Sequence, residues 1–395
     1  MILFGRLITN AGDGFYSIAM LWLVHTVTGS TIDTGLAGFL VTIPDSAKFL
    51  FGPLVDRWSI KWLLISSQVV QGIFVCIMAL IAMHPSKSII VISLLIIFIV
   101  PLTNQVSYPA EVVALTHFVP PRELTQANTW LSIIYRGSSS LFYAIAGWLI
   151  IALGLPGLLF VDVATFLITG SSYLFLPSIP QEDASASEPS YWYSLREGLR
   201  YVQGTLLKWV LFGAVLGNLA IGAGLAVLPF YAGQLGGVVV YGWMMGGMAI
   251  GGLLGALLSM RVKNLPIGYL TIGLFLGGSI LWLGSALTHN AIWATILFAL
   301  AWLPMGTTNV LLLTALQKLV PRHLVGRVIS LTISVSSVAM PLGYLVGGLS
   351  GHWVGVRETF LFSGAGILAI GGYWLAHRTL RRLPTLDKLQ QLVSS

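Results

Sequence analysis

Residues 88–110 of the chain read SIIVISLLIIFIVPLTNQVSYPA, with no charged side chain among them. About 20 predominantly apolar residues in a row are enough to cross the hydrocarbon core of a bilayer as a helix. The whole chain has this character, because 56% of its 395 residues are hydrophobic and only 8% are charged, against about 25% in a soluble globular domain. The sequence therefore predicts an all-α integral membrane protein.

Further apolar stretches follow along the chain and predict twelve transmembrane helices. They cover residues 2–27, 34–55, 62–84, 88–110, 126–152, 157–177, 208–232, 236–260, 266–288, 291–316, 328–350 and 356–378. The predicted organisation is a six-helix bundle over 1–177, a cytoplasmic linker over 178–207, and a second six-helix bundle with a short tail over 208–395. Within the linker, residues 194–203 place Leu195, Leu199 and Val202 on one face of a short amphipathic helix, which we expect on the inner membrane surface.

Lys and Arg residues in the gaps between spans are distributed unevenly. Fifteen fall on one side of the predicted membrane, and only Lys87 and Arg357 fall on the other. Cytoplasmic loops of membrane proteins carry such an excess of basic residues. We therefore expect both chain termini and the linker in the cytoplasm.

Several other functional classes lack their sequence signals here. Cys76 is the single cysteine, so an intrachain disulfide or a cysteine metal cluster is excluded. No Walker loop is present, no His has an Asp four residues on, and no basic stripe interleaved with aromatics occurs. The sequence predicts no enzyme, no cofactor, no metal centre and no nucleic-acid partner.

The two halves of the chain repeat each other. Phe4-Gly5 and Asn10 recur as Phe212-Gly213 and Asn218 at identical spacing. After the fourth span of each half, Leu115, Val119-Pro120 and Leu124 recur as Leu316, Val320-Pro321 and Leu324, and Pro101 has a counterpart in Pro304. A parallel repeat of six-helix halves is typical of transporters that bind substrate at the membrane midplane and alternate access by rocking.

The segment after the second span carries Gly52, Asp56, Arg57 and Lys61. Glycine allows helices to approach closely, and a turn carboxylate can cap a helix or pair with a base in one conformation only. The sequence thus indicates a conformational latch. A solvated loop whose basic residues only set the topology is the alternative.

A family resemblance is carried by motifs spread over nearly the whole chain. These are Gly12-Asp13, Tyr108-Pro109-Ala110, Leu124-Thr125-Gln126-Ala127-Asn128, Val161-Asp162, Arg196 to Val202, Gly326 to Leu331 and Ala339 to Gly343. With the loop around Asp56, they make the chain similar to the major facilitator superfamily, and within it to the drug-efflux branch of macrolide-efflux and enterobactin-exporter type. The resemblance implies a monomeric multidrug antiporter of the bacterial inner membrane. The chain departs from the family pattern in having a single Lys61, no Gly-Pro in the fifth span, and Ser259 and Met260 in the second copy of the loop.

Charged side chains at membrane depth are candidate functional groups, because burying them costs about 2.5–3.5 kcal/mol at a helix centre. Five are predicted there, all in the first half: Asp13, Asp45, Lys48, Arg136 and Asp162. The resemblance implies that the first four share one site, whereas Asp162 belongs to a peripheral helix and is expected to be structural. Asp13 and Asp45 are the candidate proton carriers, and two permanent salt bridges to Lys48 and Arg136 are the alternative.

Uncharged candidates for substrate contact lie on spans that line the cavity in this superfamily. They are Asn104 and Tyr108, which share a stripe with Glu111 on the fourth span, and Asn218, Trp302 and Asn309 in the second half. Such residues also join helices together in proteins of this kind. The predicted function is export of small amphipathic molecules, driven by a gradient of protons or another cation. A transporter of a defined anionic metabolite, siderophore or lysolipid, held by Lys48 and Arg136, is the alternative.

Overall fold

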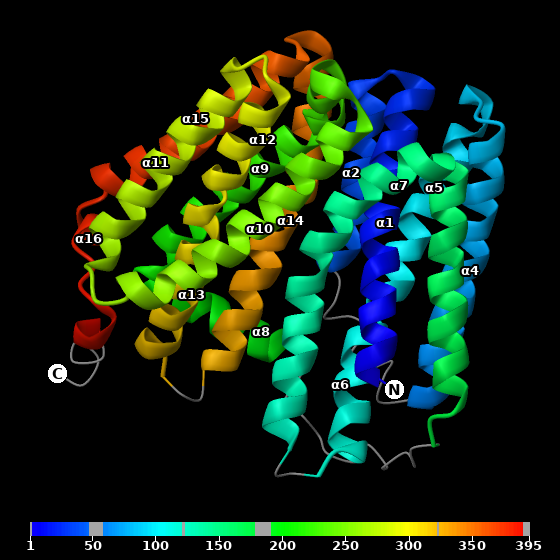
Figure 1. Cartoon of the computed structure of the whole chain (residues 1–395). Coiled ribbons are helices and arrows are strands. Elements are labelled where there is room, and N and C mark those ends of the chain that lie inside the picture. The colour runs from blue at the N-terminus through cyan, green and yellow to red at the C-terminus, as the bar shows by residue number, and fades with distance from the viewer. Residues whose placement is uncertain (1, 47–57, 121–122, 178–190, 322–323, 390–395) are drawn as a thin grey trace. The chain divides into compact units, whose positions relative to one another are not determined.

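A computed structural model describes residues 2–46, 58–120, 123–177, 191–321 and 324–389 of the chain, all of them helical or in short connections (Figure 1). The chain divides into two compact units. The first consists of Met1–Ser185 with Ala232–Gly246, and the second of Ala186–Tyr231 with Gly247–Ser395. Each unit is described by itself.

The first unit contains the helices of the first half of the chain. They are α1 (Ile2–Thr28), α2 (Thr31–Ser46), α4 (Ile60–Met83), the short 3-10 helix η2 (Lys87–Ile89), α5 (Ile90–Asn104), α6 (Ser107–Phe118) and α7 (Leu124–Leu174). Helix α7 covers the fifth and sixth predicted spans, which meet at Gly154. This glycine has φ 72° and ψ 169°, a conformation that L-residues rarely adopt, and Pro156 follows it. The chain therefore turns here without an extended loop.

The second unit is built from the later helices. They are α8 (Tyr191–Gly204), α9 (Leu207–Gly236), α10 (Val238–Val262), α11 (Ile267–Leu287), α12 (Ala291–Ala301), α13 (Leu303–Leu319), α14 (Val325–Trp353), α15 (Val356–Ala376) and α16 (Arg378–Arg381). The end of α9 and the start of α10 belong to the first unit, where Tyr241 stacks on Trp22 with 5.9 Å between the ring centroids.

The all-α membrane fold is confirmed in the described residues. In the part of the chain that the structure describes, nine helical stretches are long and apolar enough to cross a membrane. The other three predicted spans also fall on helix: α1, which carries Arg6, Asn10 and Asp13; α2, whose description ends at Ser46; and the first part of α7. Polar residues inside α1 lower its mean hydropathy, and the site described below explains their presence.

The fourth span of each half is interrupted next to its proline. Helix α5 ends three residues after Pro101, and α6 begins at Ser107. In the second unit, α13 begins at Leu303, directly before Pro304. Proline removes a backbone donor and disfavours a continuous helix. The shared interruption agrees with the repeat read from the sequence.

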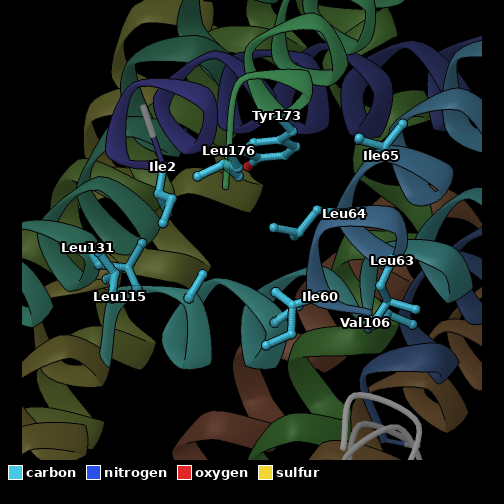
Figure 2. Packing of buried hydrophobic residues seen from close by; sticks show 12 residues of the cluster. Ile2, Ile60, Leu63, Leu64, Ile65, Val106, Leu115, Leu131, Tyr173 and Leu176 are labelled. Carbon is cyan, nitrogen blue, oxygen red and sulfur yellow. The ribbon is translucent and has the colours of Figure 1, made fainter. Parts of the chain in front are cut away.

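A cluster of buried apolar side chains joins α1, α4, α6 and α7 in the first unit (Figure 2). Ile60, Leu64 and Ile65 of α4 lie there with Ile2 of α1 and with Leu115 of α6. Tyr173, at the end of α7, belongs to this cluster and is fully buried. The packing fixes the position of the Tyr173 hydroxyl, which matters for the site.

The predicted amphipathic helix forms as α8 and packs on its own unit. Val202 is buried in a cluster with Leu316, Val320 and Val328 of α13, α14 and their connection. The Tyr201 hydroxyl donates to the Leu319 carbonyl at 3.1 Å, and Arg327 forms an ion pair with Glu197. The expectation that the whole apolar face lies on the membrane is therefore wrong for Val202, because protein covers it.

The segment after α15 also packs on the second unit. Leu380, Leu383, Leu386 and Leu389 are all buried. Backbone amides at the start of α11 donate to this segment, from Ile267 to Pro384 and from Gly268 to Leu383, both at 3.2 Å. A Cβ atom at Gly268 would collide with the carbonyl oxygens of Leu380 and Arg381. Glycine is therefore required for this close approach.

Candidate functional site

Helix α1 carries an ion pair inside the first unit. Arg6 Nη2 lies 3.2 Å from Asp13 Oδ2, and Arg6 is buried, with 2% of its side chain exposed. The two residues are seven positions apart, which is close to two helical turns, so both project from the same face. A buried guanidinium and carboxylate can offset each other's cost of leaving water.

Asp13 is also held from the fourth span. Asn104 Nδ2 donates to the same oxygen, Asp13 Oδ2, at 3.1 Å. One residue further, Gln105 Nε2 donates to Asp45 Oδ1 of α2 at 3.0 Å. Two neighbouring amides at the break between α5 and α6 thus bind the two aspartates. The break matters because it places side chains that are consecutive in sequence toward different helices.

Glu111 of α6 is the third carboxyl of this region. Its side chain is 1% exposed, and Tyr173 donates its hydroxyl to Glu111 Oε1 at 3.1 Å. Arg6 Nη1 lies 3.8 Å from the same oxygen. Arg6 therefore faces two carboxylates, one on its own helix and one on α6.

A cavity of about 310 Å³ opens beside this network. Six of its lining residues are Arg6, Asp13, Thr42, Asp45, Asn104 and Tyr143. Its volume falls within the range of about 300–1,000 Å³ that is typical of small-molecule sites. The cavity combines charged groups with apolar walls, among them Val41 and Val100.

Asp162 is fully buried on the second part of α7. A Cβ atom at Gly12 would collide with Asp162 Oδ1 and with Thr165 Oγ1, so glycine is required where α1 approaches α7. The Thr165 hydroxyl lies 3.3 Å from Asp162 Oδ1. The close approach at Gly12 joins α1 to α7 one residue before Asp13, which agrees with a structural role for Asp162.

A larger groove of about 440 Å³ lies between α4 and α7, and it has a different character. Val69, Ile73 and Leu167 line it and are half or more exposed, and none of its described lining residues is charged. Apolar side chains of this kind face lipid in a membrane protein. The polar cavity is the better candidate site.

The second unit places three predicted residues around small cavities. Asn218 and Asn309 line one of about 60 Å³, where Asn218 Nδ2 donates to the Ala214 carbonyl of its own helix at 2.9 Å. Trp302 packs against Trp282 and Phe298, with ring centroids 6.3 and 6.2 Å away. Their contact with substrate stays a prediction.

The remaining predicted residues are described only in part. Lys48, Gly52, Asp56 and Arg57 lie outside the described residues. Tyr108 and Arg136 lie on helix, but their side chains are not described. Lys61 Nζ donates to the Leu174 carbonyl at 2.7 Å, at the end of α7.

Two further charged side chains that sequence reasoning missed, Arg6 and Glu111, are also buried. The sequence offered a signal for Arg6 in its spacing of seven residues from Asp13. Glu111 lies on the polar stripe of the fourth span, but one residue beyond the predicted end of that span at residue 110. Within the described part of the chain, no three His, Cys, Asp or Glu side chains lie together as a metal site would require.

Known proteins resemble this chain along nearly its full length. The sequence pattern of the Major Facilitator Superfamily matches residues 2–343. The multidrug efflux pump Tap of Mycolicibacterium fortuitum is 25% identical, over 98% of this chain and 97% of that protein. Macrolide efflux protein A of Streptococcus pyogenes is 24% identical, over 93% of this chain and 92% of that protein.

Solved transporter structures share the fold. The nucleoside transporter NupG matches with a TM-score of 0.74 and 13% identity, over 95% of this chain and 97% of that chain. A bacterial homologue of the iron transporter ferroportin, in an inward-facing state, matches with a TM-score of 0.69 and 16% identity, over 95% of this chain and 98% of that chain.

Proposed function

Because the chain belongs to the major facilitator superfamily, we propose that this multi-pass membrane transporter is a secondary-active exporter of small amphipathic molecules, drugs among them, driven by a proton gradient. One observation carries the proposal: the ion pair of Arg6 and Asp13 lines a cavity of about 310 Å³ in the first unit. A carboxylate that lines a cavity at membrane depth can take up a proton there and change the charge of the site. The efflux activity of the relatives named above supports the direction of transport.

Alternating access would come from rocking of the halves 1–177 and 208–395 about the linker 178–207. The segment with Gly52, Asp56, Arg57 and Lys61 would act as the latch at the inner face. Asp56→Asn should then impair transport while expression stays normal, because a loop carboxylate contributes little to helix packing. Unchanged transport would favour the alternative, in which the basic residues of this segment only set the membrane topology.

The substrate class is tested by flux into reconstituted vesicles. We expect uptake of ethidium and of radiolabelled erythromycin into inside-out vesicles under an imposed pH gradient, with Asn104, Tyr108, Asn218, Trp302 and Asn309 as the substrate-contacting candidates. Transport of an anionic lysophospholipid in place of both probes would favour a transporter of anionic compounds held by Lys48 and Arg136.

Proton coupling is tested at the two aspartates separately. Asp13→Asn or Asp45→Asn at the coupling position should fold and exchange ethidium down its gradient, but should not respond to the pH gradient. Asp33→Asn, at the start of α2 and away from the cavity, is the matched control. Wild-type proton-driven uptake in both site variants would show that neither aspartate carries the proton.

The proposed location is the bacterial inner membrane with both termini in the cytoplasm. Reporter fusions after residues 177 and 395 should both read cytoplasmic. A periplasmic reading at either position would overturn this topology.

A further inference from the structure

Glu111 has no task in the transport cycle proposed above, yet it is among the most deeply buried ionisable side chains that the structure describes. Its Oε1 accepts the hydrogen bond from Tyr173 and faces Arg6, whereas its Oε2 accepts no hydrogen bond from any described residue. A buried carboxylate that serves only to hold helices together normally has its oxygens satisfied by hydrogen bonds. An oxygen without a donor is the atom on which a proton can reside.

Arg6 lies between two carboxyls, those of Asp13 and Glu111. Its guanidinium lies 3.2 Å from Asp13 and 3.8 Å from Glu111. If both carboxyls were ionised, the three side chains together would carry one negative charge, which is costly at membrane depth. One proton on either carboxyl makes the group neutral, and the shorter distance indicates that Asp13 is the ionised partner in this structure.

We propose that Glu111 is a second proton-binding carboxyl, which shares the guanidinium of Arg6 with Asp13. The inference rests on the proposed proton coupling, and it adds a second carboxyl with which Arg6 can pair when Asp13 is protonated. When Asp13 binds a proton from the cavity, its attraction for Arg6 is lost and Arg6 moves onto Glu111. Glu111 then releases its own proton to water that reaches it when access alternates, and it becomes the ionised partner. One proton is bound and one is released, so the net charge of the three side chains is unchanged.

The other groups around the pair are compatible with this exchange. From α1 and α7, Glu111 is faced by Arg6, by Asp13 and by the Tyr173 hydroxyl. On the α4 side the polar contact to α6 is Ser67 with Ser107, at 3.3 Å, which carries no charge. Asp13 is faced by Asp45 of α2 and by Tyr143 and Asp162 of α7.

The test uses purified full-length protein without any substrate, so that it is independent of the transport assay. Infrared difference spectra recorded across a pH series follow the carbonyl band of each protonated carboxyl. We expect Glu111→Gln to remove one band and to move the midpoint of the Asp13 band by about one pH unit or more to lower pH, because Glu111 then no longer competes with Asp13 for Arg6. The Asp13 band is assigned with Asp13→Asn.

Two controls separate sharing from simple burial. Asp162→Asn removes a buried carboxyl that forms no described contact with Arg6, and it should shift the Asp13 midpoint much less than Glu111→Gln does. Should Glu111→Gln fail to fold, Glu111→Asp keeps the acid but draws it back by one methylene, and it should shift the same midpoint in the same direction. An unchanged Asp13 midpoint in the folded Glu111 variant would overturn the proposal.

The transport assay then places the result in the cycle. We expect Glu111→Gln to exchange ethidium across vesicles without a gradient and to lose the response to pH. If Glu111→Gln shifts the Asp13 midpoint but the wild type transports neither ethidium nor erythromycin, the proposed export is contradicted. The proposal that Asp13 and Glu111 share Arg6 would still stand. If Glu111→Gln still transports ethidium with a normal response to the pH gradient, the proposal that Glu111 shares Arg6 with Asp13 is contradicted. The proposed export would still stand.

Discussion

The two units have equivalent helix contacts, but different kinds of side chain form them. The sequence repeat aligns Asn10 with Asn218 and Leu115 with Leu316, and Gly5 packs on Tyr173 as Gly213 packs on Trp374. On this alignment the polar network of the first unit is replaced by uncharged side chains in the second. Arg6, Asp13, Glu111 and Tyr173 correspond to Ala214, Ile221, Leu312 and Trp374.

The helix contact next to Asp13 also involves a charged residue in the first unit and uncharged residues in the second. Gly12 packs on Asp162 in the first unit, and the corresponding Ala220 accepts a hydrogen bond from Ser363 at 2.6 Å through its carbonyl oxygen. The core of the second unit contains aromatic rings packed edge-on or tilted against one another, among them Trp282, Phe298 and Phe360. Hydroxyl groups and aromatic rings are therefore sufficient to hold this helix arrangement, and the charges of the first unit are not needed for the fold. This difference supports a functional role for the charges.

The largest effect is expected from removing the guanidinium. Arg6→Ala introduces the residue that the second unit has at this position, but it leaves Asp13 and Glu111 without their shared base. Breaking a buried ion pair costs about 3–5 kcal/mol. The midpoint of thermal unfolding of the detergent-purified protein and its folded yield should both fall.

A swap variant sharpens this result. Combining Arg6→Ala with Asp13→Ile and Glu111→Leu copies the second unit into the first and should recover most of the lost stability, while proton-driven transport is abolished. If the triple variant were less stable than Arg6→Ala alone, the charges would be needed for packing after all.

The converse change tests the second unit. Leu312→Glu introduces into the second unit the carboxyl that corresponds to Glu111. No base is available to it at the position of Arg6, because Ala214 stands there. The expected cost is about 2.5–3.5 kcal/mol, that of a charge at membrane depth. Leu312→Met is the matched control, with less than about 1.5 kcal/mol. Equal unfolding midpoints for the two variants would show that the site already accommodates a charge.

A pair of tyrosines gives a smaller contrast. Tyr173→Phe removes the described hydrogen bond to Glu111 and should cost about 1–3 kcal/mol, because a buried acceptor loses its donor. Tyr373 of α15 donates to the Trp209 carbonyl at 3.2 Å in an exposed position, so Tyr373→Phe should change the unfolding midpoint little. The ranking would be refuted if Tyr373→Phe had the larger effect.

The smallest effect is expected at the surface of the second unit. Asp387 is 86% exposed and lies 3.3 Å from Lys318 Nζ. Exposed ion pairs contribute little. Asp387→Asn should leave thermal unfolding unchanged, whereas Leu389→Ala, which truncates a buried side chain of the same segment, should lower the midpoint. A clear loss in Asp387→Asn would mean that this pair, unlike most at surfaces, helps to hold the tail.

Apolar length predicted the fold from sequence, because lipid allows few alternatives to a helix bundle. Spans such as 62–84 and 266–288 coincide with helices α4 and α11 within a few residues. The site was harder to predict. Asp13 stands out in an apolar span, but nothing local indicates that its described base is Arg6 rather than Lys48 or Arg136. That choice depends on helix rotation and on the break between α5 and α6, which places Asn104 and Gln105 toward different aspartates.

Glu111 shows the same limit for long-range contacts. Its donor, Tyr173, lies 62 residues further along the chain at the end of another helix. The polar stripe on the fourth span indicated that Glu111 faces protein. Only the packing in Figure 2, where Tyr173 is fixed among Leu64, Ile2 and Leu176, determines which hydroxyl reaches it.

The packed tail of the second unit has a consequence for biosynthesis. Residues 380–389 are the last described part of the chain to leave the ribosome, and their carbonyl groups accept the first amide hydrogens of α11. Domains tend to fold in the order of their synthesis. The start of α11 must therefore wait in the membrane, with these amides bound to water or lipid headgroups, until translation has passed residue 384. Early termination would thus leave a defect more than a hundred residues upstream of the stop.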